Sequence, residues 1–520
     1  MYDAILISSH YNYMKDGTII PAQNAEDYDD LSMIIPLGII YIAQYLHDCG
    51  FKVRVVHLPH EMGMYALKQK GLKKDRLANP VEEILKKYPA YVCGIQLHFY
   101  LYCGAVFFIS NLYRKLFPAS KIFLGGSMAT ALWKELLTAS KDIDGVILGE
   151  SEKIFKKIVE KSLNSKAWDL NDIKGVAFKD DNDDFIYNAS SGKSVLAIDE
   201  IPIIYPAAPP FENIFWQERQ FINISRGLCP EKCSYCVGNN KSINARAYQT
   251  VKIDTILQQL HVYQENGLHD IFLGENHFLN TAFMKELIEN IIREDLPLNF
   301  ELETHPVIFK NRKLLTRMIE AKFLRYTMGC ESGSDSVLKR MGRNSNSKQI
   351  LDSVERIAEM GGIVLTSWIS NLPGETAAEF QETQRILRKV VKLGGFIYWI
   401  ENLHVLPGSK LYEKPQDFEI EILLNSLEDW IRWSIFSKKY MNFDEAHKEP
   451  LNYLTHLNRK VSPAVMIERF YSNRKLAQSL IPEMKFNMEN RFKDLPSDIF
   501  ETEMQVLEWY ENKGWKLWLF

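Results

Sequence analysis

The sequence contains few cysteines and no strong excess of either charge. Its 520 residues include seven cysteines, an odd number that disulfide pairing cannot use up. Lys and Arg together number 62, and Asp and Glu number 66, for a formal net charge of −4. Because nucleic-acid-binding proteins carry a basic surplus, this balance gives no reason to expect a nucleic-acid partner.

Long apolar runs are missing as well. No segment approaches the roughly 20 apolar residues of a membrane span, and the apolar stretch from Met33 to Ala43 is short and contains Pro36. The N-terminus, Met1 to Ala4, lacks the charged start and apolar run of a signal peptide. We therefore expect a cytoplasmic protein with no membrane span.

The pattern of the N-terminal third predicts an α/β domain, in a chain long enough for two or three domains. Residues 1–195 alternate short apolar strands with helices, which predicts a Rossmann-like, doubly wound parallel sheet. The expected strands cover residues 4–8, 52–56, 91–95, 121–124 and 145–148. Ligands of such sheets bind at the carboxyl ends of the strands, where Gly125 and Gly126 would let a ligand approach the backbone.

The rest of the chain divides into three parts. Prolines mark residues 196–212 as an extended linker. Strand–helix units recur in residues 213–418 and predict a partial (β/α)6 barrel with its chemistry at the carboxyl ends of the strands. Residues 419–520 are expected to be mostly helical. Trp430, Trp433 and Phe436 share one helix face there, either as core packing or as part of a substrate/lid domain.

A short cysteine-rich loop carries most of the functional information. Cys229, Cys233 and Cys236 have the spacing C-x3-C-x2-C, which can direct three thiolates at one centre. A cubane [4Fe–4S] cluster normally takes four protein ligands, so three leave one iron open for chemistry. Structural zinc is the alternative, but the nearest following histidine is His261 and no second cysteine pair follows. The spacing therefore favours an iron–sulfur cluster.

This loop and the motifs after it resemble the radical S-adenosylmethionine (radical SAM) enzymes, in which the open iron chelates S-adenosylmethionine and reduction yields a 5′-deoxyadenosyl radical. The resemblance covers about residues 215–415 and implies that strand-end residues bind S-adenosylmethionine. These residues are Tyr235, Gly274, Glu275, Glu331, Ser332, Glu375 and Pro407. The run from Asn371 to Thr376 departs from the family pattern, because Asn371 stands where glycine is usual; asparagine tolerates a positive φ better than most residues. Cys330 is a candidate catalytic hydrogen donor, and its alternative role is packing.

The N-terminal third resembles the cobalamin-binding Rossmann domain that precedes many radical SAM barrels. The matching motifs are Pro36-Leu37-Gly38, Gly125-Gly126-Ser127 and the run from Leu148 to Glu152. This resemblance implies that cobalamin contacts Gly125, Gly126, Ser127, Gly149 and Glu150. The histidine motif for the lower face of cobalt has only a weak counterpart around His60, so we expect a loop histidine there. Cys49, Cys93 and Cys103 are expected to be buried structural cysteines.

Together these features predict a cobalamin-dependent radical SAM enzyme that acts as a C-methyltransferase. It would abstract hydrogen from an unactivated carbon and transfer methyl from methylcobalamin. The alternative is radical chemistry without methyl transfer (rearrangement, cyclisation, oxidation or epimerisation), with the N-terminal domain binding cobalamin or acting as a scaffold. More distant alternatives are a methylthiotransferase and a non-catalytic corrinoid-binding protein. The expected partners are a small-molecule, lipid or peptide substrate and a one-electron reductant such as flavodoxin or ferredoxin.

Overall fold

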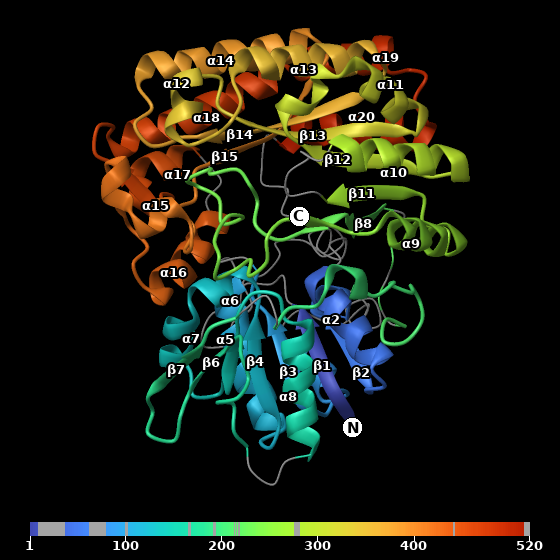
Figure 1. Cartoon of the computed structure of the whole chain (residues 1–520). Coiled ribbons are helices and arrows are strands. Elements are labelled where there is room, and N and C mark those ends of the chain that lie inside the picture. The colour runs from blue at the N-terminus through green and yellow to red at the C-terminus, as the bar shows by residue number, and fades with distance from the viewer. Residues whose placement is uncertain are drawn as a thin grey trace, which may run out of the picture.

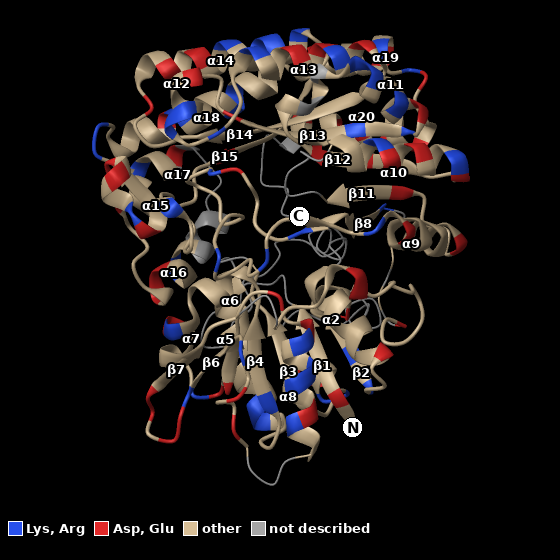
Figure 2. Cartoon of the chain, in the orientation of Figure 1, with Lys and Arg blue, Asp and Glu red and all other residues tan. Residues whose placement is uncertain are grey.

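The computed structural model places an N-terminal α/β unit below a larger barrel-like unit (Figure 1). The structure describes residues 1–8, 37–61, 80–98, 102–164, 168–190, 194–212, 214, 216, 219–274, 281–439 and 443–513. Acidic and basic residues are intermixed along the outer helices of the barrel unit (Figure 2), as the balanced composition predicts. Among the helices of these ranges, none is both long and apolar enough to cross a membrane.

The N-terminal unit is built on a seven-stranded sheet in the order β2-β1-β3-β4-β5-β6-β7. The five predicted strands are all present and pair in parallel: β1 (Tyr2–Ser8), β2 (Val53–His57), β3 (Ala90–Gln96), β4 (Lys121–Gly125) and β5 (Gly145–Ile147). The order changes direction at β1 and β3, which is the switch point of a doubly wound sheet. The predicted Rossmann-like fold is confirmed.

Helices cover both faces of this sheet because alternate strand residues point to opposite sides. One face packs on α2 (Leu37–Asp48) and α8 (Glu152–Asn164). The other packs on four helices: α4 (Pro80–Leu85), α5 (Cys103–Leu116), α6 (Ser127–Ala131) and α7 (Trp133–Ala139). Cys93 and Cys103 lie buried in this second core, as predicted. Cys49 was expected to be buried but is exposed, because it follows the last residue of α2.

Two short strands at the sheet edge were not predicted. β6 (Val176–Lys179) and β7 (Phe185–Asn188) form an antiparallel hairpin that extends the parallel sheet beyond β5. An acidic turn joins them, and Asp183 adopts a positive φ of 66° there. The side chains of β7 are exposed or half-exposed, so the segment has little of the apolar pattern that marks a strand.

The barrel unit contains six parallel strands in the order β8-β11-β12-β13-β14-β15, open between its two edges. The strands are β8 (Arg219–Asn223), β11 (Asp270–Gly274), β12 (Asn299–Thr304), β13 (Phe323–Glu331), β14 (Ile363–Ser370) and β15 (Phe396–Asn402). The connecting helices are α9 (Ile253–Glu265), α10 (Thr281–Glu294), α11 (Arg312–Glu320), α12 (Asp335–Arg340), α13 (Ser347–Glu359) and α14 (Ala377–Lys392). The predicted partial (β/α)6 barrel is therefore present.

The C-terminal part is mostly helical and contacts both units. Its helices are α15 (Lys410–Glu413), α16 (Leu427–Lys439), α17 (Phe443–Lys448), α18 (Pro463–Ser479), α19 (Ile481–Arg491) and α20 (Ser497–Lys513), and β16 (Ile420–Ile422) pairs with β17 (His456–Asn458). α16 packs on α5 of the N-terminal unit, where Trp430 and Trp433 are buried in its core. These two tryptophans therefore act in core packing, while the side chain of Phe436 lies outside the described residues.

α18 and α20 attach the C-terminal part to the barrel by polar contacts. Arg474 of α18 pairs with Glu401 of β15 at 2.9 Å. From α20, the hydroxyl of Tyr510 donates a hydrogen bond to the carbonyl of Tyr398 at 2.9 Å. The edge strand β15 of the barrel sheet is therefore contacted by residues of α18 and α20 that lie more than 70 positions away in the sequence.

Candidate active site

The cysteine loop begins where β8 ends and is closed at its base by a short antiparallel pair. β9 (Ser225–Arg226) pairs with β10 (Gln249–Thr250). Within the loop, the amide of Cys229 donates to the carbonyl of Gly238 at 3.0 Å, and the amide of Gly238 donates to Sγ of Cys236 at 3.2 Å. A Cβ at Gly238 would lie 3.4 Å from both Cys229 and Cys236, so a compact residue suits this turn.

The three thiols fit the donor set of an iron–sulfur cluster. All are free cysteines, and burial raises the pKa of Cys229 to about 11 and that of Cys236 above its usual value. Bound iron would offset this by replacing the thiol protons. Within the described ranges, no three His, Cys, Asp or Glu side chains gather around a single-ion position.

A buried polar group next to Cys233 was not predicted. Arg343 donates a hydrogen bond to Sγ of Cys233 at 3.9 Å and lies 4.0 Å from the carboxylate of Glu331. Tyr235 is half-buried beside them with its hydroxyl buried, and this burial, followed by the Glu331 charge, raises the pKa of the hydroxyl well above the usual value. No motif had singled out Arg343, because its partners lie on other segments of the chain.

Three predicted residues lie at, or directly after, the last residues of β11 and β13. A Cβ at Gly274 would lie 2.9 Å from Oδ1 of Asn223, so glycine allows the close approach of β8. Glu275 lies outside the described residues. At the end of β13, Glu331 adopts a positive φ of 63°. Burial raises the pKa of its carboxyl, and the Arg343 charge opposes that rise.

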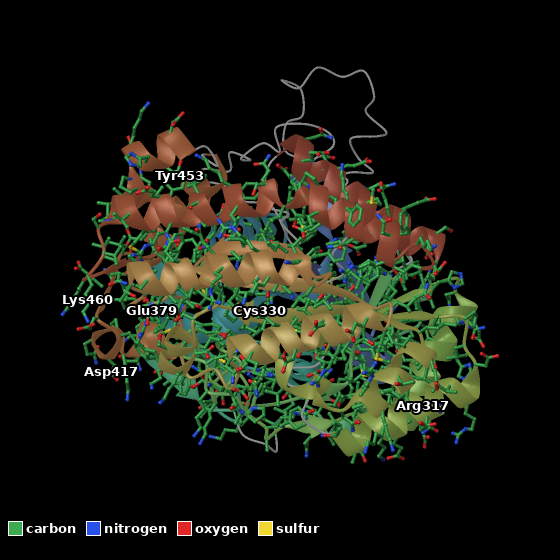
Figure 3. The ribbon with its side chains drawn as sticks, turned by 90° about the horizontal axis from the view of Figure 1, so that it is seen from above. Arg317, Cys330, Glu379, Asp417, Tyr453 and Lys460 are labelled. Atoms are coloured by element: carbon green, nitrogen blue, oxygen red, sulfur yellow. The ribbon has the colours of Figure 1, made fainter. Side chains whose placement is uncertain are left out.

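Ser332 and Cys330 both lie away from solvent. The hydroxyl of Ser332 lies 3.1 Å from that of Thr383 in α14, and the amide of Gly333 donates to the same Thr383 hydroxyl. Cys330 is fully buried in the apolar core, within the fold rather than at its periphery, where Arg317 and Lys460 lie (Figure 3). Burial raises the pKa of the Cys330 thiol well above its usual value. This setting is that of a packing residue, and the hydrogen-donor role stays a prediction.

The turn after β14 has the backbone shape expected for it. Asn371 adopts a positive φ of 65°, as an asparagine in place of glycine can. The side-chain nitrogen of Asn371 donates to Oδ1 of Asn402 at 2.8 Å and to the carbonyl of Met466 in α18 at 2.7 Å. The turn is therefore also bound to α18. Glu375 is buried, and this burial raises the pKa of its carboxyl to about 7.

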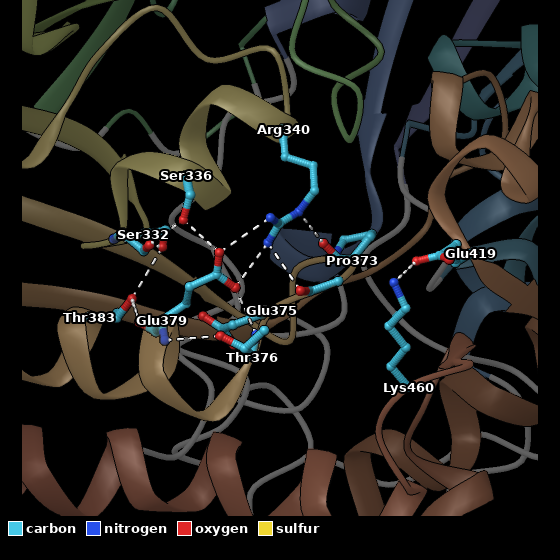
Figure 4. A network of polar contacts seen from close by, with 12 residues as sticks. Ser332, Ser336, Arg340, Pro373, Glu375, Thr376, Glu379, Thr383, Glu419 and Lys460 are labelled. Atoms are coloured by element: carbon cyan, nitrogen blue, oxygen red, sulfur yellow. Dashed lines mark hydrogen bonds and ion pairs between the residues drawn. The ribbon is translucent and has the colours of Figure 1, made fainter.

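Arg340 and Glu379 connect this turn to α12 (Figure 4). Arg340 donates to the carbonyls of Pro373 and Gly374 at 3.1 Å each, and pairs with Glu379 at 3.1 Å. Glu379 also accepts from the amide of Thr376 at 2.8 Å. The strand-end loops after β13 and β14 are therefore held against each other.

The turn around Pro407 contacts the cysteine loop. Asn240, four residues after Cys236, donates from its side chain to the carbonyl of Gly408 at 2.8 Å. The turn is closed by the amide of Ser409 donating to the carbonyl of Leu406 at 3.0 Å. The predicted binding residues after β13, β14 and β15 thus lie on loops at the same end of the barrel as the three cysteines.

The predicted cobalamin contacts follow β4 and β5 on the side of the N-terminal sheet that faces the barrel (Figure 1). A Cβ at Gly125 would meet nothing within 4 Å, so its backbone is open to a ligand. Gly126 has a φ of 114°, and a Cβ there would lie 2.6 Å from the carbonyl of Leu97. Ser127 Oγ lies 3.2 Å from Nδ1 of His98. The cobalamin contacts at Gly125, Gly126 and Ser127 stay a prediction.

Gly149 and Glu150 lie directly against the cysteine-loop segment. A Cβ at Gly149, where φ is 71°, would lie 2.9 Å from the carbonyl of Ile243. Glu150 pairs with Arg246 at 2.6 Å. His60 follows β2, an edge strand separated from β4 by β1 and β3, so it is not brought together with these residues.

Comparison with known proteins identifies the barrel unit. Residues 223–387 match the family model described as the radical SAM superfamily. An uncharacterized methyltransferase, PH0819, of Pyrococcus horikoshii is 23% identical over 359 residues, which cover 68% of this chain and 73% of that protein. The anaerobic magnesium-protoporphyrin IX monomethyl ester cyclase of Rubrivivax gelatinosus is 23% identical over 53% of this chain, and the match spans only half of that cyclase.

Solved structures extend the likeness to the whole fold. One match is the methyltransferase TsrM from Kitasatospora setae, solved with cobalamin and a [4Fe–4S] cluster bound. Its TM-score is 0.65 at 14% identity, and the match covers 92% of this chain and 89% of the TsrM chain. The cobalamin-dependent enzyme OxsB, with aqua-cobalamin and S-adenosylmethionine bound, has a TM-score of 0.62 at 12% identity and covers 99% of this chain and 84% of its own. The predicted fold is confirmed, and the family-model match supports the prediction of a radical SAM enzyme.

Proposed function

We propose that this radical SAM enzyme is a cobalamin-dependent C-methyltransferase. The observation that carries the proposal is the contact between the carboxyl end of β5 and the cysteine-loop segment, where Gly149 approaches Ile243 and Glu150 pairs with Arg246. Ligands of doubly wound sheets bind at the carboxyl ends of the strands, so a corrinoid there would lie next to the cluster loop. TsrM and OxsB, which share this fold, have been solved with cobalamin bound, and this supports the proposal.

Each group of residues has a definite task in this scheme. Cys229, Cys233 and Cys236 would hold the cluster, and the backbone at Gly125 and Gly126 would receive the corrinoid. When bound, these groups and S-adenosylmethionine supply the radical and the methyl donor.

Polar strand-end residues would bind S-adenosylmethionine. The carboxylate of Glu331 can pair with its ammonium group, and the guanidinium of Arg343, which is 12% exposed, can pair with its carboxylate. The polar atoms of Tyr235 and Glu375 that are buried without a hydrogen-bond partner fit the same ligand. Because these groups are already buried, they need little reorganisation when the ligand binds.

The proposed reaction needs a substrate with an unactivated carbon–hydrogen bond and a source of single electrons. A small molecule, a lipid or a peptide each provides carbon–hydrogen bonds of the required kind, and a one-electron reductant such as flavodoxin or ferredoxin is the expected electron source. The buried position of Cys330 offers no specific support for hydrogen return to a substrate radical. The methylthiotransferase alternative lacks support as well, since Cys93 and Cys103 lie in an apolar core.

A pair of cysteine variants tests the enzyme assignment. Protein purified and reconstituted without oxygen is incubated with S-adenosylmethionine and dithionite, and 5′-deoxyadenosine is quantified. Cys233→Ala should abolish its formation, whereas Cys49→Ala, at an exposed thiol outside the site, should form it at the wild-type rate. Formation of 5′-deoxyadenosine by Cys233→Ala at the wild-type rate would contradict the proposed cluster site.

A further inference from the structure

Two arginines stand at the neck of the cysteine loop. Arg226 lies three residues before Cys229, and Arg246 lies ten residues after Cys236. The amide of Leu228 donates to the carbonyl of Arg246 at 3.0 Å, and β9 pairs with β10 immediately outside this bond. A shift in the position of either arginine would therefore also shift the base of the cysteine loop.

Both arginines bind carboxylates of the N-terminal unit. Arg226 lies 2.6 Å from Glu152 and 3.6 Å from Glu150, and Arg246 lies 2.6 Å from Glu150. The four side chains are between 5% and 15% exposed. Despite burial, which raises it, the pKa of Glu152 is lowered overall by the Arg226 charge and hydrogen bond. This network, Glu150, Glu152, Arg226 and Arg246, is here called the neck clamp.

The two glutamates occupy a particular place in the N-terminal sheet. Glu150 follows the end of β5 after Leu148 and Gly149, and Glu152 is the first residue of α8. They therefore sit at the carboxyl edge of the sheet, the edge at which ligands bind. The neck clamp joins this edge to the cluster loop by direct contacts.

Further contacts of Arg226 and Arg246 fix the position and orientation of the neck clamp. The guanidinium of Arg226 lies 4.9 Å from the ring centre of Tyr41 in α2, and the hydroxyl of Tyr41 interacts with the backbone of Asn223 at the end of β8. Arg246 also donates to the carbonyl of Leu196. Arginine–carboxylate pairs with several donors fix orientation as well as distance.

We propose that Glu150 and Glu152 are positioning residues that set the distance and orientation of the cysteine loop relative to the ligand-binding edge of the N-terminal sheet. This inference rests on the proposed function, because that edge is the corrinoid site. Buried ion pairs add little net stability over apolar packing, whereas they specify one arrangement. The neck clamp therefore sets the geometry between the two cofactors.

Isosteric variants test the inference in the full chain. Glu150→Gln and Glu152→Gln keep the shape of each side chain and remove its charge. Glu200→Gln is the matched control, since Glu200 pairs with Lys153 of the same helix α8 at 2.8 Å but is 52% exposed. Hydrogen–deuterium exchange is read for peptides covering residues 226–250, first in protein without cofactors.

The expected result is local loosening of the loop neck. Exchange at the Leu228 amide should rise about tenfold or more in both neck-clamp variants, because local opening becomes easier, and should stay at the wild-type rate in Glu200→Gln. In reconstituted protein, pulsed electron paramagnetic resonance between Co(II) cobalamin and the reduced cluster should give a broader distance distribution.

The outcomes separate the two proposals. Unchanged exchange in residues 226–250 of both variants overturns the positioning role, whatever the cofactors do. Raised exchange in the variants, together with a wild-type protein that retains no cobalamin, contradicts the proposed function while leaving the link between Glu150, Glu152 and the loop neck intact. If Glu152→Gln yields no soluble protein, Glu150→Gln, with its more exposed carboxylate, decides the question by the same exchange measurement.

Discussion

Arg343 donates a hydrogen bond to Cys233 across 3.9 Å, although 110 residues separate them in the sequence. The same guanidinium lies 4.0 Å from Glu331 and also donates to the carbonyl of Gly329 at the end of β13. The cluster loop and the strand end that would bind S-adenosylmethionine are therefore linked through one side chain.

Replacing Arg343 should impair S-adenosylmethionine cleavage more than cluster assembly. In Arg343→Gln the thiol ligands remain, so iron content should stay near that of wild type. The loss of a charged hydrogen-bonding group should weaken binding by about 2 kcal/mol, or roughly thirtyfold. Anaerobic equilibrium binding of S-adenosylmethionine checks this, with the surface variant Arg317→Gln as control. Equal affinity in Arg343→Gln and wild type would contradict the assigned role.

Glu375 should make the protein without cofactors less stable as pH rises. Burial raises its folded-state pKa to about 7 from the usual 4.5, so the folded state holds an extra proton between these pH values. Its stabilising effect is fully present below pH 4.5 and is lost as pH approaches 7. Glu375→Gln, which stays neutral, should therefore gain about 2–3 kcal/mol relative to wild type between pH 4.5 and 8.

Denaturant titrations at several pH values measure this difference. Glu382→Gln, elsewhere on α14, is exposed and serves as the control. A wild-type and Glu375→Gln stability difference that stays constant with pH would show that the carboxyl titrates normally.

Glu379 should show the opposite pH dependence. Burial alone would raise its pKa, but hydrogen bonds from Arg340, Ser336 and the Thr376 backbone lower it to about 2. Its contribution is present above pH 4.5 and is lost as pH falls toward 2. At pH 7, Glu379→Gln should lower the free energy of unfolding by about 1–2 kcal/mol, which a lower thermal midpoint would show. At pH 4 the stability difference between Glu379→Gln and wild type should be smaller. A gap that widens on acidification would be inconsistent with the network in Figure 4.

Asn371 combines a strained backbone position with two long-range hydrogen bonds. Asn371→Gly keeps the positive φ easily but removes the bonds to Asn402 and Met466. Asn371→Ala removes the same bonds and adds backbone strain. The Asn371→Ala variant should therefore be less stable than the Asn371→Gly variant by about 1 kcal/mol. Chemical denaturation of the pair measures this, and equal stability would argue against the positive φ.

Much of the architecture was predictable because it depends on local patterns. The apolar runs that became β1 to β5 are short and bounded by turn residues, and the close spacing of Cys229, Cys233 and Cys236 marks a ligand loop without reference to the rest of the chain. The positive φ at Asn371 followed from a departure within one turn.

The contacts that join distant segments were not predictable. Arg246 and Glu150 are 96 positions apart, and each looks like an ordinary surface charge in its local sequence. Arg343 was missed for the same reason. The β6–β7 hairpin was missed because its second strand is exposed and its turn is acidic.

The cobalt and iron content of a single reconstituted sample tests the central claim most directly. Protein purified without oxygen is supplied with iron, sulfide and hydroxocobalamin, desalted, and analysed for metals and by its ultraviolet–visible spectrum. The proposed function predicts about four irons and one cobalt per chain. About four irons with no retained cobalt would contradict it and leave the N-terminal sheet as a scaffold for radical chemistry without methyl transfer.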